Sequence, residues 1–101
     1  MDALDRLDAT IRIRRDADAG TSYVASLFAK GRPKIAQKVG EEATETVIAA
    51  LAEPDKLVSE AADLVFHLLV LLADAGLSLD DVRAELARRE GVSGHIEKAS
   101  R

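Results

Sequence analysis

The 101-residue sequence contains no cysteine and very few aromatic residues. The absence of cysteine excludes disulfides, thiolate metal ligands and cysteine nucleophiles, and it is typical of a cytosolic protein. Aromatic side chains make up only 3% of the chain, although 48% of it is hydrophobic. A core of Leu, Val, Ile and Ala favours helices over strands, so we expect one all-α domain spanning residues 1–101.

The chain also lacks an excess of basic residues and a long apolar run. A net charge of -4 argues against a nucleic-acid partner and favours a divalent cation. The longest apolar segment, 64–73, is interrupted by His67 and reaches about half of the roughly 20 residues that span a bilayer. The N-terminus opens with acidic residues rather than a signal peptide. We therefore expect a soluble cytoplasmic protein without a membrane partner.

The two prolines and six glycines mark the ends of about five expected helices. Gly20 closes the first, Thr21 or Ser22 caps the second, and a turn containing Gly31 and Pro33 precedes the third. Pro54 opens the fourth helix, and Ser78 caps the fifth with Asp81 in a capping box. The expected helices cover 2–19, 22–30, 33–53, 55–75 and 78–91, with a last turn or two within 93–100.

The third and fourth helices carry the most informative patterns. On the third, we expect an apolar face of Ala36, Val39, Ala43, Val47, Ala50 and Leu51. The fourth is apolar almost all round between Leu64 and Leu72, which indicates a fully buried helix. Its polar residues share a narrow stripe: Lys56, Glu60, Asp63, His67 and Asp74. A single small bundle cannot easily cover such a helix, so a homodimer is the simplest expectation.

Acidic residues at helical spacing form the candidate site. Glu41, Glu42 and Glu45 alone would most often be a solvated helix face, but Glu60 and Asp63 lie on the helix expected to be buried. Buried carboxylates need a cation, a proton or a water-filled cleft. Antiparallel packing would set Glu42 and Glu45 opposite the second pair. An all-oxygen site suits magnesium, or manganese, rather than zinc.

Basic residues precede the acids. Lys34 and Lys38 lie one and two turns before them and could contact phosphate oxygens, which indicates phosphoryl or nucleotidyl chemistry. The turn with Lys30 and Arg32 is either an ordinary solvated loop or a second phosphate contact. His67 is more typical of a core histidine bonded to a carboxylate than of a metal ligand. His95 has no recognisable partner, and no Walker loop is present.

These motifs resemble a known family. ExxE followed by ExxD is the signature of the MazG-like superfamily of all-α nucleotide pyrophosphohydrolases, and Glu42, Glu45, Glu60 and Asp63 match it. The segments SYVASLFAKGRPKIAQKVGEEATETVIAA, EAADLVFHLLVLLADAGLSLDDVRAELARREG and SGHIEKASR resemble phosphoribosyl-ATP pyrophosphohydrolases of histidine biosynthesis over nearly the whole chain.

The resemblance implies magnesium-dependent hydrolysis of phosphoribosyl-ATP to phosphoribosyl-AMP and pyrophosphate, with the four matched acids as metal ligands. It makes Glu41 an added candidate for a ligand or a water-orienting base. The chain lacks the length and cysteines of a fused cyclohydrolase, so it resembles the stand-alone form. Two alternatives stay open: a house-cleaning pyrophosphohydrolase that acts on free nucleoside triphosphates, and a non-catalytic helical dimerisation module.

Overall fold

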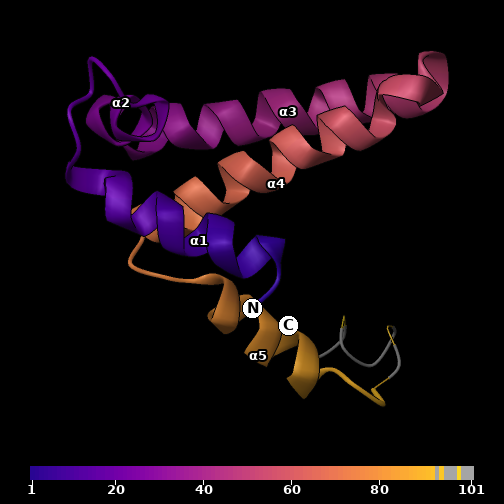
Figure 1. The fold of residues 1–101 in the computed structure, drawn as a ribbon. Coiled ribbons are helices and arrows are strands. Elements are labelled where there is room, and N and C mark those ends of the chain that lie inside the picture. The colour runs from indigo at the N-terminus through magenta and orange to yellow at the C-terminus, as the bar shows by residue number, and fades with distance from the viewer. Residues whose placement is uncertain (93, 95–97, 99–101) are drawn as a thin grey trace.

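The computed structural model describes residues 1–92, 94 and 98, and the part it describes is all-α, as expected (Figure 1). The expected last turn within 93–100 falls mostly outside these residues. Two short 3-10 turns, η1 (Arg14–Asp16) and η2 (Pro54–Lys56), accompany five helices. The helices are α1 (Ala3–Ile13), α2 (Tyr23–Lys30), α3 (Arg32–Ala52), α4 (Leu57–Asp74) and α5 (Leu79–Arg88).

Local signals explain most helix ends. The Ser22 hydroxyl caps α2 by accepting the N–H of Ala25 at 3.2 Å. Gly31 then separates α2 from α3 with a φ of +89°, a conformation that disfavours other residues. At α5, Ser78 and Asp81 form the expected capping box, in which the Asp81 carboxylate accepts the backbone N–H of Ser78 at 2.8 Å.

The first helix is shorter than the expected 2–19, since α1 ends at Ile13 and η1 at Asp16. Asp18 accounts for the difference. Its carboxylate accepts the N–H of Gly20 at 2.9 Å, and its carbonyl accepts the N–H groups of Thr21 and Ser22. These local bonds give the backbone an alternative to the helical ladder, and the helix stops before them.

Helices α3 and α4 form a long antiparallel hairpin that turns at Pro54 (Figure 1). Helices α1 and α2 pack at the end of the hairpin where α3 begins and α4 ends. The core lies at that end, so the turn of the hairpin projects away from it. The core side chains are Ile11, Val24, Leu27, Ile35, Leu69, Val70 and Ala73.

The expected apolar face of α3 is wrong. Ile35, Glu42 and Ala49, spaced two turns apart, are its buried residues, whereas the side chains of Val47 and Leu51 are 58% and 84% exposed. The sequence pattern placed the glutamates on the side of the helix opposite this apolar face. In the fold, α3 turns the line containing Glu42 toward α4 and leaves Val47 and Leu51 uncovered within the protomer.

Helix α4 is not fully buried within the protomer, contrary to the expectation. Leu69, Val70 and Ala73 are buried, but Val65 and Leu68 are 37% and 41% exposed. Helices α1, α2 and α3 cover only part of its circumference, and α1 and α2 pack near its C-terminal end (Figure 1). No single helix in the described part of the chain has both the length and the hydropathy to cross a bilayer. Only one pair of segments meets both criteria when taken together, Pro54–Asp74 with Leu79–Arg88, and this pair is bent by 100°.

Polar contacts attach α5 to α1. The Arg83 guanidinium pairs with Asp5, and it also lies 3.0 Å from Asp80. Asp8, which is 4% exposed, accepts the N–H of Leu79 at 3.4 Å and pairs with Arg12 at 2.9 Å. These bonds fix the start of α5 against the first helix at the end of the molecule away from the hairpin turn.

Candidate metal centre

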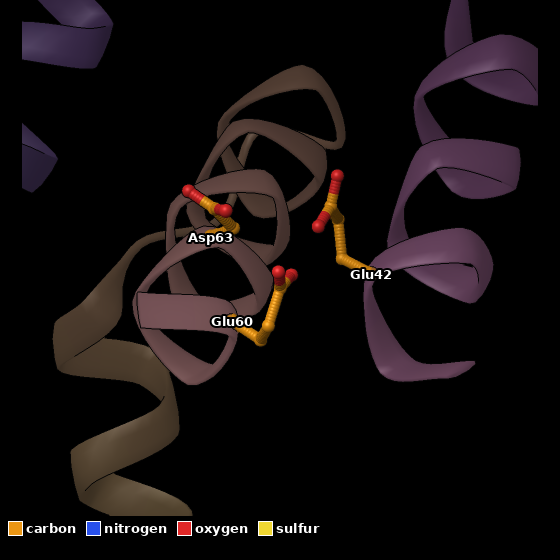
Figure 2. A group of neighbouring side chains, drawn as sticks. All are labelled: Glu42, Glu60 and Asp63. Carbon is orange, nitrogen blue, oxygen red and sulfur yellow. The ribbon is translucent and has the colours of Figure 1, made fainter. Parts of the chain in front are cut away.

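Three of the predicted acids meet between α3 and α4. One carboxylate oxygen from each of Glu42, Glu60 and Asp63 lies within 4.8 Å of the other two. Figure 2 shows Glu42 reaching from α3 toward α4, with Glu60 and Asp63 opposite it. We call these three residues the acidic cluster. Antiparallel packing therefore brings together residues from both motifs, as the sequence analysis expected.

The cluster is electrostatically strained without a cation. Glu42 is 9% exposed, and the buried oxygens Glu42 Oε2 and Glu60 Oε2 have no hydrogen-bond partner among the described residues. Burial raises the pKa of Glu42 above its usual value, and Glu45 and Asp63 add to the rise. Burial likewise raises the pKa of Glu60, again with help from Glu45 and Asp63. Binding a proton or a metal ion would therefore stabilise each of these two glutamates.

Glu45 lies beside the cluster but outside its closest group. Its carboxylate is near enough to both Glu42 and Glu60 to raise their pKa values. Its oxygens are not part of the set that falls within 4.8 Å. Of the four predicted metal ligands, the structure brings three together and places the fourth next to them.

Glu41 points to different partners. Its Oε1 accepts a hydrogen bond from Gln37 at 2.9 Å, and its Oε2 lies 3.5 Å from the Lys38 ammonium. The hydrogen bond from Gln37, followed by the charges of Lys38 and Lys34, lowers the pKa of Glu41. This carboxylate is therefore exposed, ionised and already paired, unlike those of the acidic cluster.

The four predicted phosphate contacts separate into three groups. Lys38 lies near the cluster, and the neighbouring Tyr23, followed by Glu41, raises its pKa. Lys30 and Lys34 are exposed near the start of α3. Arg32 donates from Nε to the Asp74 carboxylate at 2.8 Å and from Nη2 to the Asp74 carbonyl at 2.9 Å. Asp74 ends α4, roughly 16 Å along the helix from Asp63, so Arg32 contacts the far end of the hairpin.

His67 has partners that the sequence analysis did not identify. The expected carboxylate partner is wrong: His67 Nδ1 lies 2.8 Å from the backbone carbonyl oxygen of Asp63, and Nε2 lies 3.1 Å from the Tyr23 hydroxyl. The imidazole is only 5% exposed. Tyr23 is the residue near the site that sequence reasoning missed. Its position one residue after the α2 cap gave no signal, because the contact joins two distant helices.

A separate hollow lies between α4 and α5, with a volume of about 330 Å³. Its walls are mainly apolar, with leucines 72, 77 and 86 and Val82 among the lining residues. No residue of the acidic cluster lines it. The candidate site for phosphate chemistry is therefore the acidic cluster rather than this hollow.

Comparison with known proteins agrees with the geometry. The family model described as phosphoribosyl-ATP pyrophosphohydrolase matches residues 4–90. The chain belongs to this family. A relative from Erythrobacter litoralis named phosphoribosyl-ATP pyrophosphatase is 67% identical over all of this chain and 98% of its own length. A relative of the same name from Rhizorhabdus wittichii is 67% identical over 97% of this chain and 93% of its own length. Another, from Zymomonas mobilis, is 61% identical over 99% of this chain and 94% of its own length.

The family match includes both acidic motifs and the whole α3–α4 hairpin. The fold class and the family resemblance predicted from the sequence are thus confirmed.

Proposed function

We propose that this protein hydrolyses phosphoribosyl-ATP to phosphoribosyl-AMP and pyrophosphate, the second step of histidine biosynthesis. Water adds to phosphorus and the α–β phosphoanhydride bond breaks, with pyrophosphate as the leaving group. The observation that carries the proposal is the acidic cluster, found in a chain that matches the family over residues 4–90. The relatives named for this activity share about two thirds of their residues with the chain.

The residues of the cluster fit a divalent metal. Two of its buried carboxylate oxygens have no hydrogen-bond partner among the described residues, and all of its donors are oxygens, as Mg²⁺ prefers. We propose Glu42, Glu60 and Asp63 as ligands, with Glu45 as the neighbouring fourth, and Mg²⁺ as the ion, with Mn²⁺ able to replace it. A bound ion would supply positive charge that offsets the negative charge of the phosphate oxygens and activates water.

Basic residues of the chain are the candidates for binding the phosphate groups of the substrate. Lys38 lies close enough to Glu42 for that carboxylate to add to the rise in the pKa of the Lys38 ammonium, and this ammonium can bind a phosphate oxygen of the substrate. Glu41 contacts that ammonium at 3.5 Å and so orients Lys38 rather than a metal or a water. Lys34, one turn earlier, and Lys30 remain candidates for the more distant phosphates. Arg32 is better suited to fixing the start of α3 against Asp74 than to contacting substrate.

We further propose that two copies form a homodimer. The exposed aliphatic side chains near the hairpin turn, Val47, Ile48, Leu51 and Val58, are 54–84% exposed in the protomer. A second copy would remove this apolar surface from water. Light scattering should give twice the chain mass of 10.8 kDa, and Leu51→Lys should shift it toward the monomer. We place the protein in the cytoplasm, where its nucleotide substrate would be available.

The substrate is tested by pyrophosphate release. Purified protein with Mg²⁺ should release pyrophosphate from phosphoribosyl-ATP in preference to a panel of ordinary nucleoside triphosphates. Asp63→Asn is the control for contaminating activity, since it removes a ligand charge without removing core volume. Preference for the panel would make the protein a house-cleaning enzyme instead, and no metal-dependent turnover of either would make it a non-catalytic module.

A further inference from the structure

Tyr23, His67 and Asp63 form a chain of hydrogen bonds that leads to the acidic cluster. A carbonyl oxygen only accepts, so His67 Nδ1 must carry the hydrogen that it donates to the Asp63 carbonyl at 2.8 Å. In the neutral imidazole, Nε2 is then an acceptor, and the Tyr23 hydroxyl donates to it at 3.1 Å. The Asp63 carbonyl therefore selects the Nδ1–H tautomer of the histidine, and the Tyr23 hydroxyl, which can donate or accept, completes the arrangement by donating to Nε2.

Aromatic rings hold the imidazole from other directions. The Phe66 ring lies perpendicular to it with a centroid distance of 5.0 Å, and the Tyr23 ring meets it edge-on at 6.1 Å. Tyr23 and Phe66 also stack on one another at 6.0 Å. The His67 ring also lies close to Glu42 of the acidic cluster, because it opposes the rise in the pKa of that carboxyl. The imidazole thus has one well-defined orientation beside the cluster.

A fixed turn of α4 matters because the carboxylates of the cluster repel one another. Ionised oxygens within 4.8 Å favour side-chain and backbone movements that separate them. The bond from His67 Nδ1 spans one helical turn and resists such movement at Asp63. Packing alone does not account for the Tyr23 hydroxyl, since that side chain is 53% exposed and could bond to water instead.

We propose that Tyr23 and His67 are positioning residues of the metal site: the Tyr23 hydroxyl fixes the His67 ring, and the ring holds the turn of α4 that presents Asp63 to Glu42. Groups that orient ligands in this way commonly change metal affinity when they are removed. The proposal rests on the proposed function, because it takes the acidic cluster to be the metal site.

Tyr23→Phe tests this proposal with little change of shape, since the ring stack on Phe66 is kept. We expect the affinity of the metal-free protein for Mn²⁺, measured by calorimetric titration, to fall by about tenfold. Ser26→Ala is the matched control. It also removes a hydroxyl from α2, one that bonds to the Tyr23 carbonyl rather than to His67, and should leave the affinity within about twofold.

Nitrogen-15 NMR of the imidazole gives a second readout that is independent of bound metal and of turnover. In the metal-free wild type, we expect His67 to show a protonated Nδ1 and an unprotonated Nε2. In Tyr23→Phe, Nδ1 should stay protonated while the Nε2 signal shifts toward that of an imidazole nitrogen that accepts no hydrogen bond, and the thermal unfolding midpoint should stay close to that of Ser26→Ala.

Unchanged Mn²⁺ affinity in Tyr23→Phe would overturn the positioning role, as would an unchanged Nε2 signal or an equal loss of affinity in Ser26→Ala. Failure of the proposed metal function looks different. In that case the wild type would not bind Mn²⁺, or Asp63→Asn would bind it as tightly as the wild type does.

Discussion

Replacing Glu42 by glutamine should separate the charge of this side chain from its volume. A cation placed between three oxygens that are at most 4.8 Å apart can lie within about 2.8 Å of each (4.8/√3). With the dielectric constant of water, the attraction between a divalent ion and one carboxylate at that distance is about 332 × 2/(80 × 2.8), or roughly 3 kcal/mol. Mg²⁺ prefers oxygens at about 2.1 Å, so this is a lower limit.

About 3 kcal/mol corresponds to a loss of at least roughly 100-fold in metal affinity. We expect Glu42→Gln to show that loss in a Mn²⁺ titration and to lose turnover of phosphoribosyl-ATP with it. The metal-free variant should be at least as stable as the wild type, because glutamine removes a buried charge whose Oε2 has no partner among the described residues.

Glu41→Gln is the matched control, since it makes the same change of charge one residue earlier on α3. Its carboxylate is bound by Gln37 and Lys38, so the variant should keep Mn²⁺ affinity within about threefold. The reasoning would be refuted by wild-type affinity in Glu42→Gln, by equal losses in both variants, or by a metal-free Glu42→Gln that unfolds at a clearly lower temperature.

Three further outcomes are expected. First, the metal-free protein should become more stable as pH falls from 7 toward 4.5, the ordinary pKa of a glutamate, because the raised pKa values of Glu42 and Glu60 let the folded state bind more protons than the unfolded state. Denaturant titrations at several pH values should show this rise in the free energy of unfolding, and saturating Mn²⁺ should abolish it. Second, Lys38→Ala should raise KM for phosphoribosyl-ATP about tenfold with a smaller change in kcat, and an unchanged KM would return Lys38 to an ordinary surface role. Third, Arg83→Met should lower the thermal unfolding midpoint by a few degrees and speed amide hydrogen exchange in α5. The reason is that Arg83 pairs with Asp5 and lowers the pKa of that carboxyl to about 2. Unaltered exchange in α5 would contradict this role.

Helix ends that depend on neighbouring residues were predictable. The cap at Ser22, the break at Gly31 and the turn at Pro54 each follow from the chemistry of one or two residues, and all three occur where expected. The first helix was predicted too long because Gly20 was taken as its end. The turn around Asp18 depends on side-chain hydrogen bonds that compete with helix formation, and propensity alone does not rank the two.

The orientation of α3 was less predictable. Val47 and Leu51 are more hydrophobic than Glu42, so a periodicity argument turns the aliphatic side inward. The protomer instead buries Glu42 and leaves Val47 and Leu51 exposed. Helical spacing shows which residues share a side of a helix, whereas the neighbouring elements decide which side is covered. The buried Glu42 and the exposed Val47 and Leu51 are therefore both exceptions to the rule that apolar side chains face the core.

The sequence by itself determined the all-α class, the pairing of acids three residues apart, and the family. These features depend on composition, on the 3.6-residue period and on residue order, all of which are local. Only the tertiary structure decided that Glu42 joins Glu60 and Asp63 while Glu41 binds Lys38, and that His67 bonds to Tyr23. Those choices depend on how α2 and α3 are rotated against α4, because contacts between distant segments are set by the packing of whole helices.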